Sequence, residues 1–185
     1  MVEPRVKQIV NMLPGGQKWL KNKVVLDSGC GPARYIDCIT QYGSKSIHGL
    51  DNGADIIKKN KIKFKKNKKI SFSTGNFKKL KFKDSSFDFI FSVGVLHHCE
   101  VPIRKLMTEH HRVLKKNGMF FVFIQSSGGL QLKLWKFFRS IMNKIDINYV
   151  ESFLKNKINP LRIQGFLDHS YGELQPITRK DFEKY

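Results

Sequence analysis

The stretch that decides the fold is residues 24–35, VVLDSGCGPARY. It belongs to a short apolar run that predicts a buried strand over residues 23–28, and it then turns at Gly29 and Gly31. The residues after the turn, 33–42, predict a helix that Gly43 ends. A glycine turn between a strand and a helix lets backbone N–H groups approach a ligand closely. The stretch therefore predicts the first unit of an α/β fold, with a ligand site at the turn.

The alternation of strand and helix continues beyond this unit. The same criteria predict strands over 46–51, 70–74, 87–93 and 119–124, and helices over 53–66 and 103–114, the last ended by KKNG at 115–118. Such alternation builds a parallel sheet with right-handed crossovers. We expect a Rossmann-like, doubly wound, mostly parallel α/β sheet with helices on both faces. Ligands of such sheets bind at the carboxyl ends of the strands.

The last third of the chain departs from this pattern. Helices are predicted over 130–143, over 148–157 and from Thr178 onward. We expect one domain over 1–185, made of an N-terminal helical segment (1–22), a cofactor-binding core (23–125) and a helical substrate-side region (126–185).

Composition excludes several classes of protein. The chain is 41% hydrophobic, yet no apolar run approaches the ~18–20 residues of a membrane span. The first residues lack the apolar stretch of a secretory signal. Three cysteines have neither the number of a disulfide framework nor the spacing of a zinc site. We therefore expect a cytoplasmic protein without a structural metal and without a membrane span.

The chain is unusually basic. It has 34 Lys and Arg residues and only 15 Asp and Glu residues, so its net charge is +19. Residues 58–83 hold twelve lysines and no carboxylate. One interpretation is a basic face for RNA, DNA or another acidic surface. The other is a solvated helix face in a lysine-rich chain. Lysine is weaker evidence than arginine for specific phosphate recognition, so nucleic acid is the less favoured partner.

The glycine turn can be tested against known ligands. A phosphate-binding P-loop needs Gly-x-x-x-x-Gly-Lys-Ser/Thr, and a dinucleotide turn needs a third glycine where Arg34 stands. Neither matches. The carboxylate of Asp27, two residues before Gly29, disfavours a phosphate and suits an ammonium group. Asp51 ends the second strand about 20 residues beyond the turn, the spacing of an acid that binds ribose hydroxyls.

Four ordered motifs now carry a resemblance: VVLDSGCGPARY (24–35), HGLDN (48–52), GNFKKLKFKDSSFDFIFSVGVLHHCEVP (75–102) and HRVLKKNGMFFVFI (111–124). Together they resemble the class I S-adenosylmethionine-dependent methyltransferases over residues 20–125. More narrowly, they resemble the small-molecule branch whose fourth strand ends in VLHH. GGLQLKLWKFFR (128–139) and the later Asp168, Tyr171 and 176–178 are similar to that branch as well.

The resemblance implies ten positions that contact the cofactor: Asp27, Gly29, Cys30, Gly31, Asp51, Asn52, Asn76, Phe77, Ser92 and Val93. The first four would surround the methionine part, with Asp27 near its amino group. The next four would surround the adenosine, with Asp51 on the ribose hydroxyls and Asn76 accepting from the adenine amino group, where the family has Asp. The last two would lie under the methionine tail. Ala33 stands where the family has its third glycine, and the turn can accommodate the extra methyl group if the φ of Ala33 is negative.

The resemblance also implies the chemistry: in-line displacement of a methyl group from S-adenosyl-L-methionine, leaving S-adenosyl-L-homocysteine. Such a site mainly holds donor and acceptor in line and excludes water. No catalytic residue is assigned, and His97 is the candidate base. The fourth strand does not end in Asp/Asn/Ser-Pro-Pro-aromatic, which disfavours DNA amino groups. We expect a small-molecule O, N or C acceptor, with Trp19, the loop 94–101 and aromatic residues of 125–177 in the substrate wall.

One departure from the family bears on activity. The family's sheet ends with an antiparallel strand pair after the helix that begins near Thr178, and we expect this pair to be missing. Either the chain is truncated, or a partner chain such as a second copy completes the fold, because an open sheet edge must be covered. Two alternatives stay open: an RNA-associated methyltransferase-fold protein that binds through residues 58–83, and an inactive fragment.

Overall fold

The structure, a computed structural model, describes residues 3–124, 130–155, 157–158, 163 and 166–167. The chain divides into two compact units, Met1–Leu96 with Val101–Phe123 and His97–Glu100 with Ile124–Tyr185. The organisation as one domain stays a prediction.

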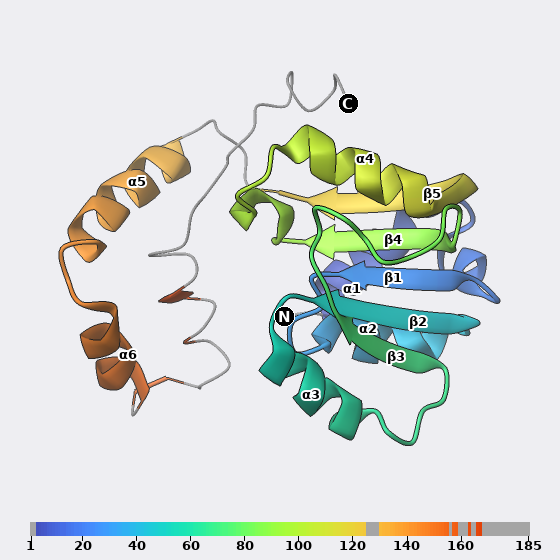
Figure 1. Cartoon of the computed structure of the whole chain (residues 1–185), viewed down its shortest axis with the longest axis horizontal. Coiled ribbons are helices and arrows are strands. Elements are labelled where there is room, and N and C mark those ends of the chain that lie inside the picture. Colours follow the sequence, from blue (N-terminus) through green and yellow to red (C-terminus); the bar gives the residue numbers. More distant parts are fainter. Residues whose placement is uncertain (1–2, 125–129, 156, 159–162, 164–165, 168–185) are drawn as a thin grey trace. The chain divides into compact units, whose positions relative to one another are not determined.

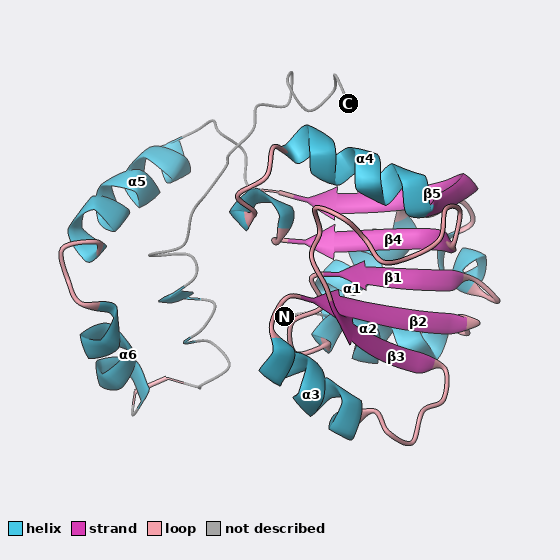
Figure 2. Cartoon of the chain, viewed as in Figure 1, coloured by secondary structure: helices cyan, strands magenta, loops and turns pink. Residues whose placement is uncertain are grey.

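The first unit is built on a parallel sheet (Figures 1 and 2). Its strands are β1 (Val24–Ser28), β2 (Ser46–Asp51), β3 (Ile70–Thr74), β4 (Phe87–Val93) and β5 (Leu114–Phe123). They lie in the order β3-β2-β1-β4-β5, and each neighbouring pair is parallel. The chain order reverses between β1 and β4, which is the point where such sheets bind ligands. The Rossmann-like parallel sheet predicted from the sequence is confirmed.

Helices cover both faces of this sheet (Figure 1). They are α1 (Glu3–Asn11), η1 (Gly16–Leu20), α2 (Arg34–Ile39), η2 (Thr40–Tyr42), α3 (Ala54–Lys63) and α4 (Ile103–Val113). The short helix η3 (Leu96–His98) begins at the last residue of the first unit's long segment and continues into the second unit. In Figure 1, α1 and α2 lie behind the sheet and α4 lies in front of it. Because strand side chains alternate between faces, Asp27 and Ser28 project to opposite sides of β1.

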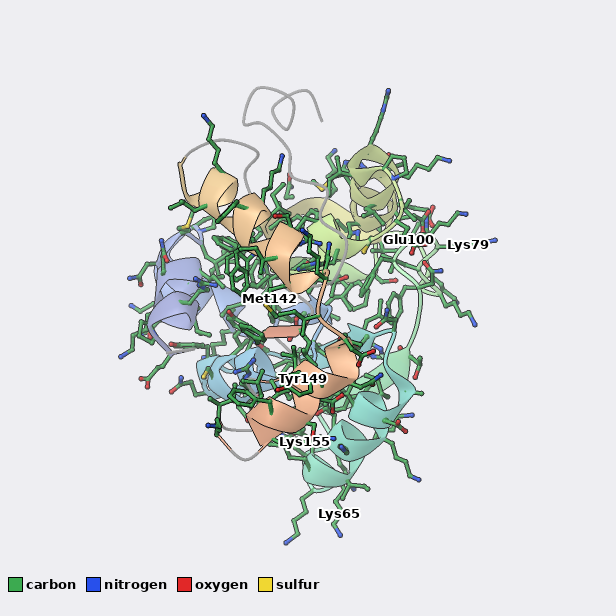
Figure 3. All side chains as sticks on the ribbon, turned by 90° about the vertical axis from the view of Figure 1, so that its left-hand side faces the viewer. Lys65, Lys79, Glu100, Met142, Tyr149 and Lys155 are labelled. Carbon is green, nitrogen blue, oxygen red and sulfur yellow. The ribbon has the colours of Figure 1, made fainter. Side chains whose placement is uncertain are left out.

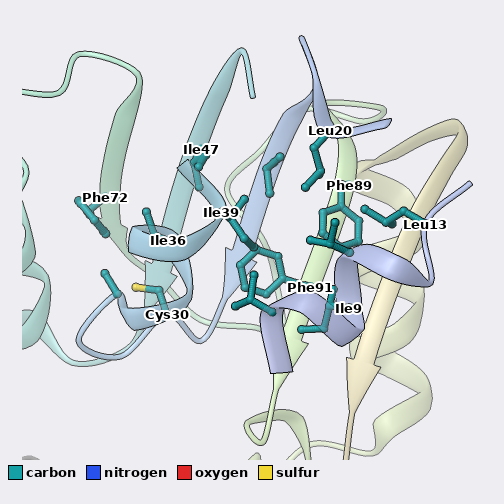
Figure 4. Close-up of a cluster of buried hydrophobic side chains, with 14 of the residues drawn as sticks. Ile9, Leu13, Leu20, Cys30, Ile36, Ile39, Ile47, Phe72, Phe89 and Phe91 are labelled. Carbon is teal, nitrogen blue, oxygen red and sulfur yellow. The ribbon is translucent and has the colours of Figure 1, made fainter. Parts of the chain in front are cut away.

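The core lies between the sheet and α1 and α2 (Figure 4). It joins Ile9 of α1 and Ile36 of α2 to Phe89 and Phe91, whose rings stack with centroids 5.7 Å apart. Trp19, expected in the substrate wall, packs edge-on against Phe89 with ring centroids 6.0 Å apart. Its ring therefore contributes to this hydrophobic core.

KKNG does not end a helix, and this prediction from the sequence is wrong. Helix α4 ends at Val113, and residues 115–118 lie inside β5. The N–H groups of Ser85 and Ser86 donate to the carbonyls of Arg112 and Val113, and Leu114 then pairs with Phe87. These bonds draw the chain into the sheet earlier than expected. The surplus residues are accommodated as a register shift in the pairing with β4.

The second unit contains α5 (Leu130–Met142) and α6 (Ile147–Lys155), close to the predicted helices over 130–143 and 148–157. Trp135 and Phe138 stack with ring centroids 4.9 Å apart, and Phe138 meets Phe166 edge-on. The expected helix from Thr178, the expected absence of a final strand pair and the motif of Asp168, Tyr171 and 176–178 lie outside the described residues. Within the described part, no helix is long and apolar enough to cross a membrane.

Candidate functional site

Four strands of the first unit end at one edge of the sheet. Asp27 and Ser28 end β1, Asp51 ends β2, and Ser92 and Val93 end β4. Residues 75–77 follow the end of β3, which pairs in parallel with β2. The structure thus brings the ten predicted cofactor contacts to the strand ends around one switch point between β1 and β4.

Backbone hydrogen bonds fix the glycine turn to the end of β2. The N–H groups of Gly29 and Cys30 both donate to the carbonyl of Leu50, at 2.8 and 2.9 Å. The N–H of Gly31 donates to Oδ2 of Asp51 at 2.8 Å, and the N–H of Gly53 donates to Oδ1 at 3.0 Å. Asp51 therefore shapes the turn, and each of its oxygens keeps a second lone pair for a ligand hydroxyl.

Three turn positions, Gly29, Gly31 and Ala33, have positive φ. Gly29 has φ 89°, and a Cβ there would lie 2.4 Å from a methyl group of Val95. Glycine is therefore required at residue 29, and Val95 covers the turn without having been predicted to do so. Ala33 has φ 56° and is fully buried, so the negative φ that would have accommodated its methyl group is not adopted. A left-handed alanine costs roughly 1–2 kcal/mol.

The carboxylate of Asp27 is the electrostatic centre of the site. Its side chain is 2% exposed, and Oδ2 has no hydrogen-bond partner among the described residues. Burial, and then the nearby charge of Asp51, raises the pKa of Asp27 well above its ordinary value. A buried carboxylate oxygen without a donor is costly and is suited to receive an ammonium group.

Asn60 is a site residue that the sequence did not single out. It is 2% exposed, and its Nδ2 donates to the carbonyl of Gly31 at 2.7 Å and contacts Sγ of Cys30 at 3.9 Å. It stands among the lysines of residues 58–83, a stretch whose composition is typical of a solvated helix face. The signal that could have found it is its position three residues after the apolar Ile57, on the same face of α3.

The adenosine side of the expected site is the loop over residues 75–86. Oδ1 of Asn76 accepts from the N–H of Lys78 at 2.7 Å, while Phe77 is buried and Asn52 is exposed. Arg112 anchors this loop, donating to the carbonyls of Leu80 and Phe82, both at 2.9 Å.

A carboxylate partner holds that arginine in place. The guanidinium of Arg112 also binds both carboxylate oxygens of Glu109. These bonds lower the pKa of Glu109, and Oε2 of Glu109 accepts from the N–H of Leu80. The loop is therefore fixed from α4, which positions Asn76 and Phe77 at the strand ends.

The other candidate groups have distinct environments. His97 is 4% exposed, and its ring centroid lies 4.3 Å from that of His98. Burial raises the pKa of the Cys30 thiol, and it raises the pKa of Cys99 to about 11. Both thiols are thus poor nucleophiles. Within the described residues, no group of three His, Cys, Asp or Glu side chains could hold a metal ion. The role of His97 stays a prediction.

The methyltransferase-domain family model matches residues 26–122. The chain belongs to this family. Its class is that of the S-adenosylmethionine-dependent class I methyltransferases, as the four motifs implied, while membership of the VLHH branch stays a prediction. S-adenosyl-L-methionine is the cofactor of this class, and the residues present fit it. The unpartnered oxygen of Asp27 suits its ammonium group, and the free lone pairs of Asp51 suit its ribose hydroxyls.

Individual relatives agree with this assignment. A tRNA U34 carboxymethyltransferase of Helicobacter pylori is 36% identical over 103 residues, which are 54% of this chain and 39% of the relative. The match to this curated relative thus spans about two fifths of the relative's length.

Solved structures share the fold. An S-adenosylmethionine-dependent methyltransferase from Mesorhizobium loti superposes with TM-score 0.56 at 23% identity, over 66% of this chain and 52% of that one. Haemonchus contortus phosphoethanolamine N-methyltransferase 1, in complex with phosphoethanolamine and S-adenosylhomocysteine, superposes with TM-score 0.58 at 21% identity, over 69% of this chain and 26% of that one.

Proposed function

We propose that the protein transfers a methyl group from S-adenosyl-L-methionine to a small-molecule O, N or C acceptor in the cytoplasm. The observation that carries this proposal is the pair of carboxylates at adjacent strand ends. Asp27 is buried with an unpartnered oxygen, and Asp51 shapes the glycine turn with lone pairs to spare. When bound, the cofactor supplies a methyl group already activated on a sulfonium.

The chain's own residues then bind and orient. Asp27 would accept hydrogen bonds from the ammonium group, and Asp51 would accept them from the ribose hydroxyls. Charge-assisted bonds of this kind contribute about 1.5–3 kcal/mol each. Asn76 has a second lone pair on its amide oxygen for the adenine amino group, a neutral bond worth about 1 kcal/mol. Asn52 and Phe77 would flank the adenosine, and Ser92 and Val93 would lie under the methionine tail.

A dedicated base is needed only for an acceptor that keeps its proton at neutral pH, such as a hydroxyl. His97 is our candidate for that role. For other acceptors, holding the two reactants in line and excluding water supplies most of the acceleration.

The test is a calorimetric titration of the full chain with S-adenosyl-L-homocysteine. We expect micromolar binding that Asp51→Ala weakens by at least about tenfold, from the loss of one or two charge-assisted bonds of about 1.5–3 kcal/mol each. Asp55→Ala is the matched control, because it removes an exposed carboxylate of α3. No binding by the folded wild-type chain would overturn the proposal and leave an inactive fragment. Equal weakening by both variants would also overturn it.

A second candidate acceptor is RNA, which the tRNA-modifying relative favours. Incubation with methyl-labelled cofactor, small-molecule extracts and total RNA separates the two candidates. Label in the RNA fraction would support the second, and label in the small-molecule fraction would support the first. A second copy of the chain as partner stays a prediction.

A further inference from the structure

A groove of about 430 Å³ runs along α3. Three lysines line it, Lys58, Lys61 and Lys65, together with apolar side chains of the helix and Thr74 from the end of β3. Lys58 and Lys61 lie three residues apart on one face of α3, and Lys65 stands in the turn that follows this helix. At 1.5 Å of rise per residue, the backbone positions of Lys58 and Lys61 are spaced about 4.5 Å along the helix axis. The groove therefore presents a line of positive charges.

The charge around the groove is not neutralised locally. Of the twelve lysines in residues 58–83, Lys63 is ion-paired with Asp37, and none of the other eleven pairs with a carboxylate within the described residues. Lys65 and Lys79 extend into solvent at the periphery of the molecule (Figure 3). Uncompensated lysines in a row create a positive potential that attracts a polyanion.

We propose that the α3 groove binds single-stranded RNA through its phosphate backbone. A line of lysines meets a chain of phosphates, and lysine, as a point charge, suits backbone contact without sequence preference. Apolar side chains in the groove, such as Ile62 at 61% exposure, can contact bases or sugars. The Thr74 hydroxyl can pair with a ribose 2′-hydroxyl, which DNA lacks. This function adds to methyl transfer and does not depend on it.

A membrane surface fits the groove less well. Helices that lie on bilayers expose a continuous apolar face with Trp, Phe or Leu. On α3 the apolar Ile57 is buried, and Ile62 is the one large apolar side chain of this helix that is exposed. A concave groove also admits a flexible strand more readily than a flat bilayer.

The experiment measures fluorescence anisotropy of a labelled 20-nucleotide single-stranded RNA with the full chain at several salt concentrations. We expect log affinity to fall with log salt by about 0.7 for each neutralised phosphate. The triple variant Lys58→Gln, Lys61→Gln, Lys65→Gln should weaken binding by about tenfold or more and reduce that slope by about 2. The control Lys18→Gln, Lys21→Gln, Lys45→Gln removes the same charge from exposed positions near the amino ends of β1 and β2 and should change affinity by less than about threefold.

Three outcomes overturn the proposal. The first is no RNA binding at moderate salt. The second is equal weakening by both triple variants, because net charge alone would then explain binding. The third is tighter binding of phosphatidylserine vesicles or single-stranded DNA of the same length. Circular dichroism checks that both variants fold. Titration with S-adenosyl-L-homocysteine separates this proposal from methyl transfer, because the α3 triple variant should bind that ligand as the wild type does.

Discussion

The hydroxyl of Ser28 lies 2.8 Å from Nε2 of His110, and both side chains are buried. Nδ1 of His110 lies 2.6 Å from the carbonyl oxygen of Leu106, which can only accept, so Nδ1 carries the proton. Burial lowers the pKa of His110, so Nε2 of the neutral ring accepts from Ser28. The hydroxyl of Ser92 donates to the carbonyl of Ser28 at 2.7 Å. A buried polar chain thus joins α4 and β4 to the residue just before Gly29.

The losses of stability from removing Ser28 and His110 one at a time should not add. We expect His110→Leu to lower the free energy of unfolding by about 1–3 kcal/mol, because the buried Ser28 hydroxyl loses its acceptor. Ser28→Ala should cost about 1–2 kcal/mol, because Nε2 of His110 then lacks its donor. The double variant should cost less than the sum of the two, which urea denaturation can measure as a double-mutant cycle. Additive losses would mean that the two side chains do not interact.

Asp27→Asn should separate stability from cofactor binding. The pKa of Asp27 is raised in the folded state, so the folded protein binds the proton more tightly than the unfolded chain does. The ionised carboxylate therefore costs stability at neutral pH. We expect the amide variant to be about 1–3 kcal/mol more stable at pH 7, because a buried charge is removed, and to bind S-adenosyl-L-homocysteine at least about tenfold more weakly.

Thermal denaturation and calorimetric titration measure the two effects of Asp27→Asn. The exposed Asp55→Asn is the control and should change neither quantity. Unchanged cofactor affinity in Asp27→Asn would show that the buried carboxylate does not contact the ligand.

The sequence predicted those parts of the site that depend on local spacing. Asp27 and Asp51 end apolar runs, so their convergence at one sheet edge follows from parallel strands. The sequence could not predict the hydrogen bond between Ser28 and His110, because it joins residues 82 positions apart. Only the packing of α4 on the sheet brings His110 to its partner Ser28. The sequence could not predict the positive φ of Ala33 either, since alanine normally adopts a negative φ.

Asn60 should affect the cofactor through the glycine turn. Asn60→Ala removes the donor to the Gly31 carbonyl. We expect unfolding to be easier by about 1–2 kcal/mol, because that carbonyl is left without its bond, and affinity for S-adenosyl-L-homocysteine to fall about fivefold. Lys59→Ala, one residue earlier and exposed, is the control, because it shortens a side chain of the same helix without touching the turn. A loss of stability without a loss of affinity would make Asn60 purely a packing residue.

Stability should fall as pH drops from about 6.5 to 4, and His48 contributes to this fall. Its ring nitrogens lie 2.8 and 2.7 Å from the hydroxyls of Ser71 and Ser73. Burial, and then the charge of Lys61, lowers the pKa of His48 from 6.5 to about 4. Between these two values the unfolded chain binds the proton and the folded protein does not, so acid favours unfolding across this window and no further below it.

His48→Gln isolates that contribution, because it keeps a donor and an acceptor between the two serines and cannot titrate. We expect the wild type to lose about 2 kcal/mol more than this variant between pH 6.5 and 4, at about 1.4 kcal/mol per pKa unit and with partial exposure reducing the total. Urea denaturation at several pH values measures the difference. The exposed His111→Gln serves as the control and should follow the wild type. Parallel curves for the wild type and His48→Gln would place the acid sensitivity elsewhere, with His110 the next buried histidine of lowered pKa.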